Sequence, residues 1–178
     1  PSGLGYAELA APSAAPSPRH AADLIVGVAR ERPGEVTLLT LGPLTNLALF
    51  LRAFPGLHDR IGAISVMGGS LGSGNITASA EFNIIADPEA ADVVFRSGVP
   101  ITMIGLDVTH QALLDRPAAA ALRALGTHSG RIAADLTDYA LDRNLEWSGA
   151  ATSAIHDAVA IAHLLAFFWF HHYGPPPP

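Results

Sequence analysis

Three short runs rich in aliphatic and β-branched residues alternate with helix-like segments, and this alternation limits the folds open to the chain. The runs are EVTLLTLG (35–42), RIGAISVMGG (60–69) and PITMIGLDVT (100–109). Mostly apolar runs without strict apolar–polar alternation are typical of strands buried on both faces of a parallel sheet. We therefore predict strands near residues 36–41, 61–67 and 100–106.

The segments between and after these runs carry helix signals. Apolar residues recur at helical spacing and Pro or Gly follows most expected ends, which predicts helices within residues 19–34, 44–56, 87–98, 115–145 and 156–168. Asp87, followed by Pro88, is typical of a helix N-cap and is interpreted as structural. Strands alternating with helices predict an α/β fold with an open, mostly parallel sheet and helices on both faces. The last helix is short of charges and is expected to be buried.

Composition and charge limit the domain count and the kinds of partner. Apolar residues make up 49% of the 178 residues, so we expect one partial domain, 1–178, with a disordered proline-rich tail at 171–178. The net charge of −6 argues against nucleic acid, whose phosphates need a basic patch. The chain has no cysteine, which excludes disulfides and thiolate sites and slightly favours a cytoplasmic location. Residues 161–170 are too few for a bilayer span of about 20, so no membrane partner is expected.

Polar side chains gather in the glycine-rich segment MGGSLGSGNITASAEFNIIADPEAA (67–91). This segment follows the second predicted strand, and ligands of open α/β sheets bind at the carboxyl ends of strands. Its amides and carboxylates suit a ligand that is rich in hydroxyl groups. A phosphate cradle is disfavoured, because the segment has neither a dinucleotide motif in the required context nor a P-loop lysine.

Several blocks of the sequence, in matching order and spacing, resemble the inosine-uridine-preferring nucleoside hydrolases. The blocks are GPLTNLA, MGG, GN, AEFNI-x-x-DPEAA, LDVTHQ and AIHDAVAIA. The resemblance implies a Rossmann-like fold and an N-ribohydrolase, in which water cleaves the bond between a nucleobase and ribose. It also implies a bound Ca²⁺ that holds the attacking water and the ribose diol.

The same resemblance assigns roles to residues of the glycine-rich segment. Asn75, Glu81 and Asn83 would hydrogen-bond the hydroxyls of the ribose. Met67 would pack against the sugar. The implied substrate is therefore a small ribonucleoside.

Three further residues receive roles in metal binding and catalysis. Asp157 and the backbone carbonyl of Leu41 would be Ca²⁺ ligands, consistent with the preference of this ion for oxygen. His156 would donate a proton to the departing base, a role that suits an imidazole near neutral pH. The alternative for His156 is a buried histidine that is merely satisfied by a hydrogen bond.

The roles of five other residues are less defined. Asp107 and Thr109 end the third run and at most orient the site. Tyr139 and Trp147 are candidates for contacts with the base, and the role of His110 stays open.

The family's aspartate cluster, D-x-D-x-x-x-D-D, does not occur in the chain. The resemblance assigns to this cluster Ca²⁺ ligands and the base that activates water. We therefore expect an incomplete member that also lacks most of the C-terminal part, whereas the complete protein would form homodimers or homotetramers. Two alternatives stay open: an inactive fragment or pseudoenzyme that retains a ribose-binding loop, and an unrelated doubly wound nucleotide-binding domain.

We predict that the 178-residue chain alone does not hydrolyse inosine or uridine. One late aspartate and one carbonyl supply too few of the roughly 6–8 oxygens that Ca²⁺ requires. Release of free base from either nucleoside, followed in the presence of Ca²⁺, measures the activity. Turnover above background would contradict the prediction.

Overall fold

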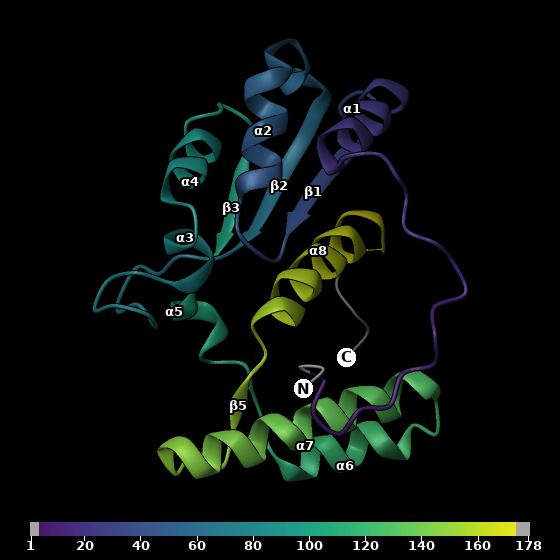
Figure 1. Ribbon diagram of the computed structural model, residues 1–178, viewed down its shortest axis with the longest axis vertical. Helices are drawn as coiled ribbons and strands as arrows, with labels where there is room; N and C mark the ends of the chain where they lie inside the picture. Colours follow the sequence, from purple (N-terminus) through teal and green to yellow (C-terminus); the bar gives the residue numbers. More distant parts are fainter. Residues whose placement is uncertain (1–3, 174–178) are drawn as a thin grey trace. The chain divides into compact units, whose positions relative to one another are not determined.

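The computed structural model describes residues 4–173, with side chains described from 4 to 166 (Figure 1). These residues belong to two compact units, each described by itself. The sheet unit contains Ser17–Thr109 and the segment from His156 onward. The hairpin unit contains the N-terminal segment up to Pro16 and His110–Ile155. The expectation of a single domain over 1–178 stays a prediction.

The sheet unit is built on three parallel strands in the order β1-β2-β3. Their bounds are Val36–Thr40 (β1), Ile61–Met67 (β2) and Ile101–Ile104 (β3). This confirms the predicted parallel strands. The third strand is shorter than predicted, because Leu106–Thr109 turns into a short helix, α5.

Helices cover both faces of this sheet, as predicted. Successive strand residues point to opposite faces, so Leu38 and Ile64 pack with one cluster while Leu39 and Met67 pack with another. The first cluster includes residues of α1 (Ala21–Glu31), α2 (Thr45–Ala53) and α4 (Pro88–Phe95). The second includes Val159 and Ala160 of α8 (His156–Tyr173). The core is therefore divided by the sheet into two layers.

Side-chain caps explain where several helices begin. His20 accepts a hydrogen bond from the backbone N–H of Ala22 at the start of α1. Asp87 accepts one from the N–H of Ala90 at the start of α4, with Pro88 in the first turn, which confirms its structural interpretation. Two features were not predicted: a 3-10 helix η1 (Pro55–Arg60) after α2 and a one-turn helix α3 (Phe82–Ile85) inside the glycine-rich segment.

The prediction that the last helix is buried is wrong for its described side chains. Ala160 is fully buried, but Ile161 and Leu165 are 41% and 66% exposed. An apolar helix is buried all round only when neighbours cover every side, and the main described contacts of α8 are with β2 and α5. The helix also extends through residues 171–173, where the tail was expected to begin. Residues 174–178 of that tail lie outside the described residues.

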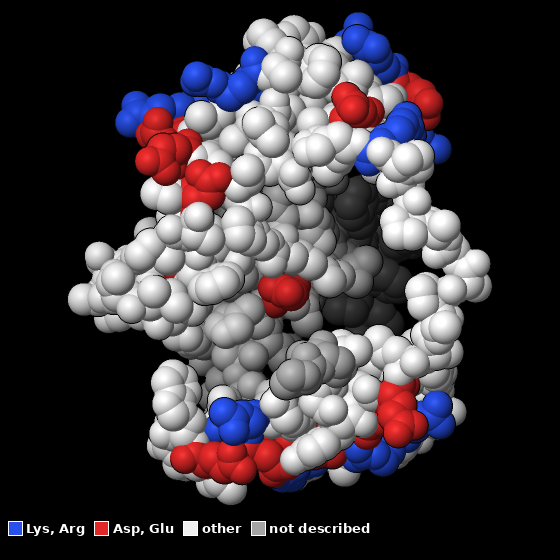
Figure 2. Space-filling view, viewed as in Figure 1, with Lys and Arg blue, Asp and Glu red and all other residues white. Residues whose placement is uncertain are grey.

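The hairpin unit consists mainly of α6 (Arg116–Ala124) packed against α7 (His128–Ser148). Two two-residue strands, β4 (Leu113–Leu114) and β5 (Ser153–Ala154), pair antiparallel in the same unit. Two arginines of α6 form ion pairs with aspartates of α7: Arg116 with Asp138 and Asp142, and Arg123 with Asp135 and Asp138. Figure 2 shows acidic and basic side chains intermixed along these helices. None of the described helices combines the length and apolar character needed to cross a membrane.

The capping carboxylate of Asp87 makes the stability of the sheet unit depend on pH. The Thr45 hydroxyl donates to it at 2.5 Å and the Ala90 N–H at 3.0 Å, and these bonds hold the pKa of Asp87 below its ordinary value. A lowered pKa in the folded state stabilises the fold above the ordinary aspartate pKa, and this contribution is lost as the pH falls through the lowered pKa.

We therefore expect Asp87→Asn to lower the urea midpoint of unfolding at neutral pH. The difference from the wild type should shrink in acid, because the wild-type carboxyl then loses its charge as well. Asp59→Asn, which removes an exposed charge from η1, is the matched control. A difference that is constant across pH would contradict the assigned role.

Candidate active site

The carboxyl ends of the three strands lie level with one another. Register pairs Met67 with Ile104, and Leu41 follows Thr40, which pairs with Val66. The chain beyond β3 approaches that beyond β2, since the Leu106 N–H donates to the Gly69 carbonyl at 2.9 Å. Gly105 permits this approach: a Cβ there would lie 3.0 Å from the Gly69 carbonyl oxygen and 2.6 Å from Asp107 Oδ1.

A buried carboxylate ties the end of β2 to α3. Oε2 of Glu81 accepts from the N–H of Gly69 at 2.9 Å and from the N–H of Ile84 at 3.2 Å. Glu81 is thereby the N-cap of α3, and its side chain is 3% exposed. This structural role was missed by the sequence analysis, because a four-residue helix leaves no periodic signal.

Two amides complete the same arrangement. Nδ2 of Asn83 donates to the Met67 carbonyl at 3.0 Å and lies 3.4 Å from the Met67 sulfur. Oδ1 of Asn75 accepts from the N–H of Phe82 at 3.0 Å. Met67, Asn75, Glu81 and Asn83 therefore form one connected group, which we call the loop cluster. The structure brings together these four predicted residues, although nothing bound there tests their roles.

The loop that carries Asn75 is ordered by its own hydrogen bonds. The Asn75 N–H donates to the Ala80 carbonyl at 3.1 Å, and Thr77 Oγ1 accepts from the Ala80 N–H at 2.9 Å. Gly74 lies so close to this turn that a Cβ would be 2.2 Å from the Ala80 carbonyl oxygen. Asp107 Oδ1 holds the other side of the loop by accepting from the Leu71 N–H at 3.1 Å.

Three polar atoms of the loop cluster make no hydrogen bond to any described residue. They are Oε1 of Glu81, Oδ1 of Asn83 and Nδ2 of Asn75. Within residues 4–166 the one fully buried side-chain polar atom without a partner is Ser65 Oγ, so these three atoms remain accessible. Two acceptors and one donor are complementary to neighbouring hydroxyl groups, each of which both donates and accepts.

His156, the first residue of α8, is half-buried and contacts the end of the α5 turn. Its Nδ1 lies 2.8 Å from the hydroxyl of Thr109, a residue that is 0% exposed. One turn later, Ala160 packs in the same apolar cluster as Met67. The helix that begins at His156 therefore packs on the same face of the sheet as Met67, the last residue of β2.

The predicted metal ligands are less well assembled. Asp157 is exposed, and Leu41 is 37% exposed just beyond β1. Among the described residues, no group of three or more His, Asp or Glu side chains is arranged to hold a metal ion. The donors in this part of the chain therefore do not make up a Ca²⁺ site by themselves.

The candidate base-contacting residues belong to the hairpin unit. The ring of Tyr139 packs edge-to-face on that of Tyr6, with centroids 5.3 Å apart, and Trp147 is 89% exposed. His110 is exposed in the same unit. Their predicted roles stay predictions.

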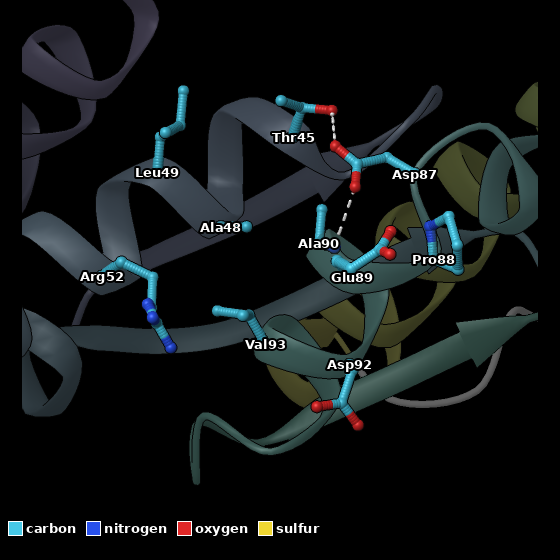
Figure 3. A pocket seen from close by; sticks show the side chains of 10 residues that line it. All are labelled: Thr45, Ala48, Leu49, Arg52, Asp87, Pro88, Glu89, Ala90, Asp92 and Val93. Carbon is cyan, nitrogen blue, oxygen red and sulfur yellow. Dashed lines mark hydrogen bonds between the residues drawn. The ribbon is translucent and has the colours of Figure 1, made fainter.

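A large cavity of the sheet unit lies elsewhere. It is an open groove of about 660 Å³ between α2 and α4, lined by Thr45, Leu49, Arg52, Asp87, Glu89 and Val93 among others (Figure 3). None of the predicted site residues lines it. We give more weight to the strand ends, because the predicted site residues lie there and the Asp87 carboxylate in the groove is occupied by Thr45 and Ala90.

The role of Glu81 as a clamp is testable in the chain itself. Glu81→Ala should lower the free energy of unfolding by about 1–3 kcal/mol, because it leaves the Gly69 N–H without its acceptor. Glu81→Gln should cost less, since it keeps an acceptor oxygen. Urea denaturation measures both, with Glu35→Ala at an exposed position as control. Equal stability of Glu81→Ala and the wild type would show that the clamp is dispensable.

Comparison with known proteins places this arrangement in a family. The sequence profile described as Inosine-uridine preferring nucleoside hydrolase matches residues 1–173. The chain is 45% identical over 165 residues to the pyrimidine-specific ribonucleoside hydrolase RihA of Salmonella arizonae and 44% identical to that of Citrobacter koseri, covering 92% of this chain and 53% of each relative.

Solved structures agree with the sequence relatives. A purine-preferring ribonucleoside hydrolase from Gardnerella vaginalis superposes with a TM-score of 0.87 at 35% identity, over 93% of this chain and 53% of that one. The plant nucleoside hydrolase PpNRh1 superposes with a TM-score of 0.84 at 29% identity, over 89% and 50%. The chain spans about half the length of the curated relatives it matches. It belongs to the inosine-uridine-preferring nucleoside hydrolase family.

Proposed function

We propose that the protein containing this chain is an N-ribohydrolase that splits ribonucleosides into ribose and free base. The observation that carries the proposal is the set of unpaired polar atoms in the loop cluster, on Asn75, Glu81 and Asn83. Their other polar atoms are held by backbone groups at 2.9–3.2 Å, so the free atoms are fixed before a ligand arrives. Fixed donors and acceptors cost little reorganisation when charge develops in a transition state.

The ribose is the part of the substrate that the loop cluster would bind. Its hydroxyls would donate to Glu81 Oε1 and Asn83 Oδ1 and accept from Asn75 Nδ2. Met67, buried at the end of β2, would form an apolar floor under the sugar. Cleavage of a glycosidic bond passes through an oxocarbenium-like state, which the nearby carboxylate of Glu81 would stabilise.

His156 would assist the departure of the base. A nucleobase leaves poorly as an anion, and an imidazole near its pKa at neutral pH is a suitable proton donor. The family relatives include a pyrimidine-specific and a purine-preferring enzyme. The proposal therefore names ribonucleosides as a class and no preferred base.

Calcium is part of the proposal, with a limited set of donors in this chain. The Asp157 carboxylate and the Leu41 carbonyl would supply oxygens, and further oxygens would have to come from outside these 178 residues. When bound, the ion would supply Lewis-acid activation of water. The lack of a three-residue metal group among the side chains of residues 4–166 favours a second candidate for the chain by itself: a ribose-binding module without hydrolytic activity.

The proton-donor role predicts a difference between substrates in the complete gene product. His156→Ala should lower the rate of inosine or uridine hydrolysis by roughly 10²–10⁴-fold, the usual contribution of general acid catalysis. It should affect p-nitrophenyl riboside little, because that leaving group departs without a proton. Asn83→Ala should impair both substrates alike, because it acts on the sugar.

Steady-state rates of both variants on both substrates provide the test. Arg96→Ala, on the exposed surface of the sheet unit, serves as the control variant. Equal damage by His156→Ala on nucleoside and aryl riboside would remove the proton-donor role. A complete gene product without activity on any ribonucleoside would refute the enzymatic proposal and leave the ribose-binding module.

A further inference from the structure

We propose that Thr109 is a positioning residue that orients the imidazole of His156. This inference deepens the proposed function, since it rests on His156 as the proton donor. It starts from a contact between two distant parts of the chain, the α5 turn after β3 and the first residue of α8. The Thr109 Oγ1 atom lies 2.8 Å from His156 Nδ1.

The threonine is held rigidly at this point. Its side chain is 0% exposed, and its backbone N–H donates to the Gly105 carbonyl at 3.0 Å. The neighbouring Leu106, 1% exposed, donates its own N–H to the Gly69 carbonyl. The hydroxyl therefore sits on a turn that is fixed to the ends of β2 and β3, so the imidazole is placed relative to the loop cluster.

A hydroxyl oxygen suits this task because it accepts a hydrogen bond from a ring N–H. In the proposed arrangement Thr109 Oγ1 accepts from Nδ1–H of His156, so that Nε2 is the nitrogen that gives its proton to the leaving base. The neutral ring left behind carries its proton on Nδ1, and the hydrogen bond to Oγ1 keeps its orientation.

The first test is spectroscopic, uses the 178-residue chain and requires no enzymatic activity. In the neutral ring, the ¹⁵N signal of His156 Nδ1 should carry the shift of a protonated nitrogen, because its N–H donates to Thr109 Oγ1. The signal is assigned by its loss in His156→Gln. Thr109→Ser, which keeps the hydroxyl, should retain the shift, and Thr109→Val, which keeps the shape, should move it toward the value of an unprotonated nitrogen, because the acceptor that holds the proton on Nδ1 is lost.

The wild-type spectrum is decisive even if Thr109→Val does not fold. An unprotonated Nδ1 in the neutral wild-type ring, or the same signal in the wild type and a folded Thr109→Val, would overturn the proposal. Folding of each variant is checked by circular dichroism.

The second test uses the complete gene product. Thr109→Val should lower kcat on inosine or uridine by up to about 100-fold, the scale expected when a reacting group is misplaced, and leave KM and the rate on p-nitrophenyl riboside nearly unchanged. Thr109→Ser should restore most of the nucleoside activity. Loss of activity on both substrates in Thr109→Val would assign the residue a merely structural role. If His156→Ala proves harmless while the Nδ1 shift depends on Thr109, the proposed proton donor fails and the hydrogen bond alone remains, so the two failures are distinguishable.

Discussion

One carboxylate oxygen, Oε2 of Glu81, holds together the segment on which the candidate site depends. It accepts from the Gly69 N–H beyond β2 and from the Ile84 N–H within α3, so two backbone segments fifteen residues apart are fixed to the same atom. The cost of burying this carboxylate is offset by two charge-assisted hydrogen bonds. Because α3 starts at Glu81, the position of Asn83 and its bond to the Met67 carbonyl follow from the same contact.

Single residues of the candidate site therefore combine a contact within the fold with an atom that is open to solvent. In Glu81, Asn83 and Asn75 one polar atom is used by the fold and the other is open to a ligand. The structural roles and the proposed binding roles can therefore be separated in mutagenesis only if stability and activity are measured in parallel. The proposed metal ligands are different, because Asp157 is exposed and no group of three metal-binding side chains occurs among the described residues.

Much of the sheet unit follows from the sequence. The β-rich runs around Leu38 and Ile64 form parallel strands, and Asp87 caps α4 as its Asp-Pro pattern predicts. The misses have physical causes. Four residues, as in α3 and α5, are too few for a helical period, and the apolar sequence of α8 predicts burial although the described neighbours cover one side of it. The residues of the loop cluster were predicted from the family motifs. The hydrogen bonds of Glu81 to Gly69 and Ile84 were not predicted, because no local sequence pattern indicates the turn on which they depend.

The contact between Thr109 and His156 also joins two points at which the chain passes from one unit to the other. The chain passes between the two compact units three times, and two of these passages fall at Thr109–His110 and Ile155–His156. On one side the passages are joined by the Thr109–His156 hydrogen bond, and on the other by the Ile155 N–H, which donates to the Ala112 carbonyl, and the β4–β5 pair. Each unit therefore ties the two crossing segments together by hydrogen bonds of its own. Within the sheet unit, the position of the residue proposed to deliver the proton depends on a contact with a residue 47 positions earlier in the sequence.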